Sequence, residues 1–117
     1  MNRDQNPSTE TVLRDLLSRR ILILDGAMGT ELEAGGIPMD SHAWCGLANL
    51  THLDQVRGIH EDNIRAGADV VTANTFMSGV GPMRRAGVSD RFEEGIRSAV
   101  RAAPTKTPTC GRCSPKA

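Results

Sequence analysis

The sequence predicts an α/β fold in which parallel strands alternate with helices, and three observations indicate this class. Residues 21–24 are four consecutive apolar residues that end at Asp25-Gly26, the pattern of a strand buried on both faces and followed by a turn. A helical pattern covers residues 53–66, and a second strand-like run, residues 68–73, follows directly. Two strands joined through a helix are parallel, with a right-handed crossover. The pattern is that of the opening of an α/β fold, either a barrel or a doubly wound sheet.

The element before the first strand is predicted to be a helix at residues 9–20, with Ser8 or Thr9 as its N-cap. Its apolar stripe consists of Val12, Leu13, Leu16 and Leu17. After the strand, any helix over residues 30–34 is predicted to end at the Gly-Gly-Ile-Pro sequence of residues 35–38.

The helix between the two strands has the clearest boundaries. Thr51 and Asp54 have the spacing of a capping box, in which a hydroxyl and a carboxylate three residues later satisfy backbone donors. Apolar residues then recur with a 3.6-residue period, and His60 lies on that apolar side, where we expect a packed core histidine. Gly67 stands where a left-handed glycine cap ends a helix.

A last helix is predicted to start near Asp90, where Glu93 completes a second capping box. Two strands and three helices are few elements for a core, and two parallel strands do not make a stable sheet alone. We therefore expect residues 1–103 to form part of a domain.

Residues 104–117 differ in composition from the rest of the chain. Residues 1–103 carry 11 arginines, 14 acidic residues and no lysine, whereas residues 104–117 carry Lys106, Arg112, Lys116 and no acidic residue. This segment also holds three of the six prolines and no Val, Leu, Ile or Phe, which predicts disorder. A shifted reading frame, a premature gene end and a genuine flexible tail each explain the change.

The overall composition argues against several classes of protein. The 117 residues include 14 basic and 14 acidic ones, which does not favour binding to nucleic acid. No apolar run reaches 18 residues and the N-terminus has no secretory signal, so we expect a cytoplasmic protein with no membrane partner. Three cysteines, an odd number, fit a cytosolic chain and not a disulfide framework.

Polar residues follow both predicted strands and are the candidate site. Carboxyl ends of parallel strands face the ligand in such folds, which selects Asp25-Gly26 and Asn74-Thr75. The Asp25 carboxylate could hold an ammonium group, and Asn74 and Thr75 could bind a carboxylate or polarise a carbonyl. The structural alternative is that Asp25 only caps the following segment and Asn74 only closes a turn.

Two other motifs are weak. The glycine-rich residues 26–30 lack the third glycine of a dinucleotide fingerprint and the Gly-Lys-Ser/Thr of a P-loop. The pair Cys110 and Cys113 is a solitary CxxC, whereas a zinc site needs four ligands, or three and a water. Trp44, the single tryptophan, could pack over a substrate or close the end of a barrel.

Residues 24–32 and 66–76 together resemble homocysteine S-methyltransferases and the homocysteine-binding module of cobalamin-dependent methionine synthase, and the resemblance covers roughly residues 18–103. It implies a (β/α)8 TIM barrel of about 300 residues, of which this chain would be the first quarter to third. It also implies methyl transfer from a donor to the thiol of homocysteine, giving methionine. By this resemblance Asp25 binds the substrate amino group with Gly26 close against it, and Asn74 and Thr75 line the pocket.

The resemblance further implies a zinc ion held by three cysteines, which lowers the pKa of the homocysteine thiol. The family's cysteines follow a Gly-x-Asn motif and lie within a Gly-Gly-Cys-Cys-Gly stretch, and neither motif occurs here. Cys45, Cys110 and Cys113 therefore do not inherit the role, and we expect a fragment that binds no zinc and is inactive alone. The alternatives are one piece of a split methyltransferase and a small βαβ binding or interaction protein.

Overall fold

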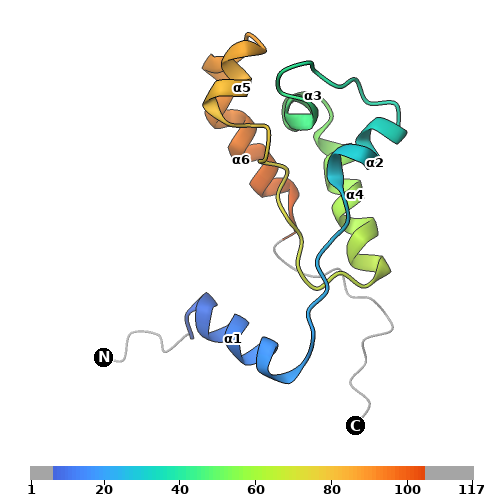
Figure 1. Cartoon of the computed structure of the whole chain (residues 1–117), viewed down its shortest axis with the longest axis vertical. Helices are drawn as coiled ribbons and strands as arrows, with labels where there is room; N and C mark the ends of the chain where they lie inside the picture. The colour runs from blue at the N-terminus through green and yellow to red at the C-terminus, as the bar shows by residue number, and fades with distance from the viewer. Residues whose placement is uncertain (1–6, 105–117) are drawn as a thin grey trace.

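The computed structural model describes residues 7–104. Within this range it contains six α-helices and two short 3-10 helices, namely α1 (Thr9–Arg19), α2 (Met28–Ala34), η1 (Cys45–Leu47), α3 (Ala48–Thr51), α4 (Leu53–Ala66), α5 (Val80–Arg85), η2 (Ser89–Arg91) and α6 (Phe92–Ala102). Figure 1 shows α1 apart from the other helices, at the end of the extended segment that leads into α2. The predicted disorder after residue 104 and the CxxC motif lie outside the described residues.

The two predicted strands, residues 21–24 and 68–73, are extended segments joined by one isolated parallel bridge between Leu24 and Val70. The backbone N–H of Asp25 donates to the carbonyl oxygen of Val70 at 2.9 Å. The predicted parallel direction is therefore confirmed, but the prediction of regular strands is wrong for the described residues. The reason is that a pair of short segments with no further neighbour cannot extend its ladder.

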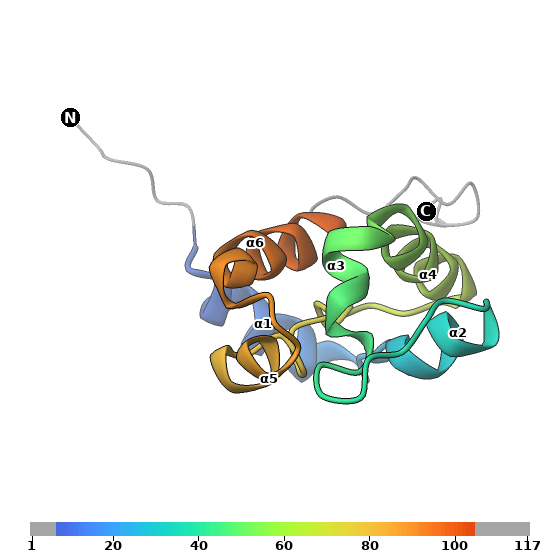
Figure 2. The same ribbon diagram turned by 90° about the horizontal axis from the view of Figure 1, so that it is seen from above.

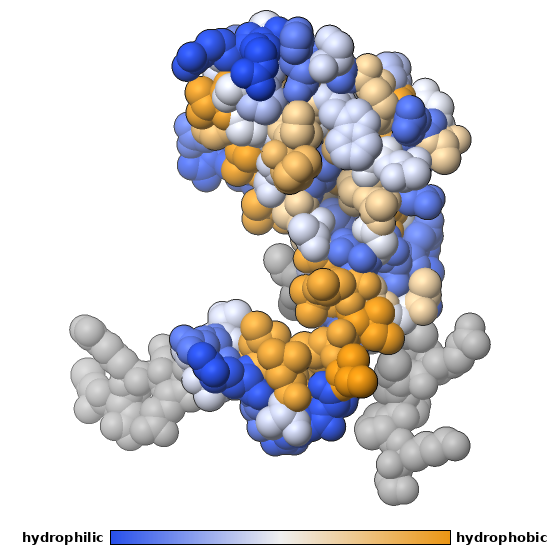
Figure 3. All heavy atoms as spheres, viewed as in Figure 1, coloured by the Kyte–Doolittle hydropathy of each residue, from blue (hydrophilic) through white to orange (hydrophobic). Residues whose placement is uncertain are grey.

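The prediction that the first segment is buried on both faces is also wrong. Ile21 is 88% exposed, Ile23 58% and Leu24 66%, and Phe76 after the second segment is 85% exposed. Figure 3 shows apolar surface gathered in the lower part of the molecule, over the extended segment after α1 and on the side of α1 that faces it. The described residues supply no helix or strand to cover this face, so an apolar run that would be core in a complete sheet faces solvent here.

The core lies between the helices on one side of the extended segments. Figure 2 shows α4 and α6 side by side, with α3 next to both. The buried cluster at its centre consists of Leu32, Cys45, Ala48, Val56 and Ala102. The inner face of α4 buries Val56 and, as predicted, His60.

Several helix boundaries follow the predictions. Ser8 caps α1, its hydroxyl oxygen accepting a hydrogen bond from the backbone N–H of Thr11 at 3.2 Å. α2 ends at Ala34, so the predicted break at residues 35–38 is confirmed. Gly67 ends α4 with a φ of 116°, a left-handed conformation that favours glycine.

Both predicted capping boxes are wrong. Thr51 belongs to the preceding helix α3, where its hydroxyl donates to the carbonyl oxygen of Leu47 at 3.0 Å and is not available to cap α4. The helix α6 begins at Phe92, after a 3-10 turn that contains Asp90. Glu93 pairs with Arg97 one turn later instead of reaching back to the helix start. The helices themselves form because their apolar faces pack, without these caps.

None of the described helices has the length and apolar character needed to cross a membrane.

Candidate substrate-binding site

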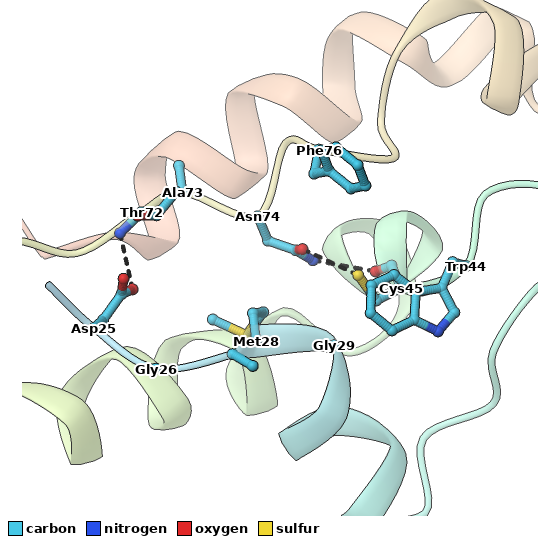
Figure 4. Close-up of a pocket in the computed structure, with 11 residues that line it drawn as sticks. Asp25, Gly26, Met28, Gly29, Trp44, Cys45, Thr72, Ala73, Asn74 and Phe76 are labelled. Atoms are coloured by element: carbon cyan, nitrogen blue, oxygen red, sulfur yellow. Dashed lines mark hydrogen bonds between the residues drawn. The ribbon is translucent and has the colours of Figure 1, made fainter.

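A cavity of about 390 Å³ opens between the two extended segments and the loop before η1. One wall is residues 25–29, the opposite wall is formed by residues 72–74 and 76, and Trp44 and Cys45 close one end (Figure 4). Its size is in the lower part of the range for small-molecule pockets, about 300–1,000 Å³. Three of the four predicted site residues, Asp25, Gly26 and Asn74, line this cavity, and Thr75 does not.

Asp25 connects the two segments. Its side chain is only 5% exposed, and its Oδ2 accepts a hydrogen bond from the backbone N–H of Thr72 at 2.8 Å. Within residues 7–104, no hydrogen bond reaches the other carboxylate oxygen, Oδ1. Asp25 does not cap α2, because the N-cap is Ala27 and no side chain satisfies that end. The structure therefore gives Asp25 one oxygen with a structural contact and one without a hydrogen-bond partner among residues 7–104.

Gly26 is held close to α4. Its backbone N–H donates to Oδ1 of Asn63 at 3.1 Å, and a Cβ atom at this position would lie 3.2 Å from the same oxygen. The absence of a side chain thus lets the loop approach the helix, and it brings Asp25 to the rim of the cavity. The sequence pattern placed Asn63 on the apolar face of a helix, but nothing in it predicted the contact with Gly26.

Asn74 is 5% exposed and is fully engaged with neighbouring protein groups. Its Nδ2 donates to the carbonyl oxygen of Cys45 and to Oδ1 of Asn49, both at 3.1 Å, and its Oδ1 accepts from the thiol of Cys45 at 3.3 Å. Ser78, also buried, donates to the backbone carbonyl oxygen of Asn74 at 3.2 Å. These contacts fix the segment after the second strand against the loop that carries Trp44 and Cys45.

Thr75 is half-buried beside the cavity. Its backbone N–H donates to the carbonyl oxygen of Ala73 at 2.8 Å, which makes a tight turn. The turn places Phe76 at the cavity and turns Thr75 away from its lining. The sequence indicated the polar pair Asn74-Thr75, but no pattern in it pointed to Phe76, Thr72 or Met28 as lining residues.

Trp44 forms the end wall of the cavity and packs on Gly29. A Cβ atom on Gly29 would lie 2.7 Å from Cζ2 of the indole, a separation that forces one of the two groups to move. Trp44 also has a positive φ of 43°, which is uncommon for a residue with a side chain. The loop before η1 is therefore held in a conformation that brings the indole over the glycine-rich segment.

Replacing Gly29 by alanine is expected to push the indole of Trp44 away from the cavity. Because Trp44 is the single tryptophan of the chain and is now 38% exposed, its fluorescence emission should shift to longer wavelength. The measurement is the emission maximum of the isolated chain excited at its tryptophan band.

The matched control is Gly58→Ala in the middle of α4, where an added Cβ meets nothing within 4 Å. This change should leave the emission unaltered and stabilise the helix by roughly 0.5–1 kcal/mol. Equal emission from wild type and Gly29→Ala would contradict the proposed contact between Gly29 and Trp44.

The described residues do not provide a zinc site. Within residues 7–104, no group of three His, Cys, Asp or Glu side chains is close enough to hold a metal ion. Burial raises the pKa of the Cys45 thiol, and that thiol donates a hydrogen bond to Asn74, so Cys45 is in the form that a metal does not bind. The donor set of this part of the chain therefore does not fit the zinc ion that the resemblance implies.

A parallel crossover with a cavity at the carboxyl ends of its two extended segments is the arrangement in which α/β proteins bind small ligands. Comparison with known proteins identifies the family within this class. The sequence profile of the family described as homocysteine S-methyltransferase matches residues 22–110. This match spans most of the chain, and the chain therefore belongs to the homocysteine S-methyltransferase family, whose fold is of the TIM-barrel type.

Individual relatives agree with the family profile. The chain is 35% identical over 89 residues to methionine synthase of Mycobacterium tuberculosis, covering 73% of this chain and 8% of that protein. It is 36% identical over 84 residues to homocysteine S-methyltransferase 4 of Zea mays, covering 69% and 24% respectively. It is 41% identical over 72 residues to homocysteine S-methyltransferase of Escherichia coli, covering 61% and 23%.

The chain thus spans no more than 24% of the length of these three relatives. No solved structure matches the chain.

Proposed function

We propose that this chain forms the N-terminal portion of a (β/α)8 barrel and binds the amino end of homocysteine for methyl transfer to its thiol, which gives methionine. The family profile and the names of the matched relatives support this proposal. A match over most of the chain does not favour the alternative of an unrelated small binding protein.

The observation that carries the proposal is the Asp25 carboxylate at the rim of the cavity. A carboxylate holds an ammonium group through charge-assisted hydrogen bonds, which are stronger than neutral ones. Oδ2 is fixed by the N–H of Thr72, so the carboxylate is held in one orientation while Oδ1 remains available. The apolar side chains of Met28 and Phe76 lie across the same cavity and suit the short aliphatic chain of homocysteine.

Activation of the thiol requires groups beyond those described here. A thiol with a pKa of about 8.5 is only a few per cent thiolate at pH 7, and the thiolate is the nucleophile. The described residues hold no donor set that fits zinc, and Cys45 is engaged with Asn74. We therefore assign substrate anchoring to this chain, and assign thiol activation and binding of the methyl donor to the remainder of the barrel.

The Asp25→Asn replacement tests the anchoring role. It is made in a protein that joins residues 22–103 of this chain to the rest of the barrel of the Escherichia coli relative. Loss of the charge facing the ammonium group should weaken homocysteine binding by about 1.5–3 kcal/mol, roughly 10- to 150-fold. Titration calorimetry measures the affinity for homocysteine and for 4-mercaptobutyrate, which lacks the amino group.

Binding of 4-mercaptobutyrate should not be weakened by Asp25→Asn, because that ligand has no ammonium group for Asp25 to hold. Asp62→Asn, which removes a carboxylate that is 76% exposed on α4, serves as the charge-matched control. An unchanged homocysteine affinity in the Asp25→Asn protein would show that Asp25 does not hold the amino group.

A further inference from the structure

His60 is a buried polar residue whose position has no explanation in packing alone. Its side chain is 0% exposed, and within the described part of the chain neither ring nitrogen has a hydrogen-bond partner. An unpartnered buried polar group lowers stability, whereas a leucine would fill the same space without that cost. The group that faces the ring nitrogens is therefore the place to look for the reason that a histidine is buried here.

The ring faces the carboxylate of the candidate site. Nδ1 of His60 lies 3.9 Å from Oδ2 of Asp25. This distance is too long for a hydrogen bond, but in a buried environment it allows a strong interaction between the ring dipole and the charge. Burial lowers the pKa of His60, and the charge of Asp25 opposes this effect. Because the pKa lies below 6.5, the imidazole is neutral at pH 7, and Asp25 is the charged group that its Nδ1 faces.

The same face of α4 acts on both residues of the loop. Asn63, one turn after His60, accepts the hydrogen bond from the backbone N–H of Gly26 at 3.1 Å. Residues three positions apart on a helix are neighbours on its surface. One face of α4 therefore contacts the loop twice, at the backbone of Gly26 and at the side chain of Asp25.

We propose that His60 is a positioning residue for Asp25. Its Nδ1–H is directed at Oδ2, which keeps the carboxylate beside the N–H of Thr72 and leaves Oδ1 for the ammonium group of an amino-acid ligand. The identity of the ligand rests on the proposed function, but the 3.9 Å approach of His60 to Asp25 is present without a ligand, so the interaction is tested without one.

The experiment is a pH titration of the ¹⁵N-labelled complete chain, followed by long-range ¹H–¹⁵N spectra that report the protonation of each ring nitrogen. The signals of His60 are assigned by their loss in His60→Gln. We expect a neutral ring protonated on Nδ1 at pH 7, with a titration midpoint below the ordinary histidine value of 6.5. Asp25→Asn should move the midpoint to still lower pH and remove the preference for protonated Nδ1.

Asp62→Asn is the control, because Asp62 is on the same helix but exposed. It should leave the midpoint and the tautomer of His60 unchanged. The proposal is overturned if the ring titrates at the ordinary value or does not respond to Asp25→Asn. It is also overturned if Asp25→Asn and Asp62→Asn change the ring equally. A purely structural role for His60 predicts no dependence of its tautomer on the charge of Asp25.

The two proposals fail separately. If the spectra show the coupling but Asp25→Asn leaves homocysteine affinity intact in the joined protein, the proposed function fails and the positioning role stands. If the affinity falls but His60 does not respond to Asp25, the positioning role fails alone.

Discussion

Purified alone, the chain is expected to form no methionine from homocysteine, whereas the joined protein with the remaining barrel is expected to do so. Two physical requirements are missing from the isolated chain. The thiol needs an activating group to become thiolate, and none fits the described residues. The donor and acceptor must also be held in line, and such positioning contributes up to roughly 7–11 kcal/mol to lowering a barrier.

The measurement is methionine formation with added zinc and a panel of methyl donors, namely S-methylmethionine, S-adenosylmethionine, betaine and a methylated carrier. The added part of the Escherichia coli barrel, expressed without residues 22–103, controls for activity that it contributes alone. Turnover by the isolated chain at a rate comparable with the joined protein would show that the chain is not an inactive portion of the enzyme.

Replacing Asn74 by alanine is expected to destabilise the isolated chain by about 3 kcal/mol or more. The replacement leaves Oδ1 of Asn49 without its donor and the thiol of Cys45 without its acceptor, at a cost of about 1–3 kcal/mol for each buried group. Complete small domains have only about 5–15 kcal/mol of stability, so this loss is a large share of what a part of a domain can have. Urea denaturation followed by far-ultraviolet circular dichroism measures the change.

Thr75→Ala is the matched control on the neighbouring residue. The hydroxyl of Thr75 makes only a 3.5 Å contact with the carbonyl oxygen of Ala73, so its loss should change stability by less than about 1 kcal/mol. Equal denaturation midpoints for the two variants would argue that Asn74 is not structural, and would favour a direct contact between its amide and the substrate.

Acidification should also destabilise the chain, through His60. Burial lowers the pKa of His60 in the folded state below the ordinary value of 6.5, so the unfolded state binds the proton more readily. The stability associated with the neutral ring is present above pH 6.5 and is lost as the pH falls toward the folded-state pKa. In His60→Leu this part of the pH dependence of the urea midpoint should disappear. If the midpoints of wild type and His60→Leu fall in parallel below pH 6.5, the buried ring is not the cause.

Local patterns in the sequence were sufficient for much of the fold. The 3.6-residue period predicted α1 and α4, Gly67 marked the end of α4, and the helix between two apolar runs predicted their parallel direction. The same local reasoning placed Asp25 and Asn74 at one cavity, because carboxyl ends of parallel segments meet at one edge. These features depend on residues that are close in the chain or on a rule of connection.

Only the tertiary structure decided which polar groups are free. Asn74 satisfies partners 25 and 29 residues away, and Asp25 accepts from a backbone N–H 47 residues away. No period or spacing encodes such contacts, because they arise when separate elements pack. The exposure of Ile21 and Leu24 has the same origin, since burial of an apolar run depends on neighbours that the run itself does not specify. The sequence by itself determined α1, α4 and α6, the crossover and the polar residues at its end, and packing added α3 and α5 and decided which of those polar atoms already have partners in the described residues.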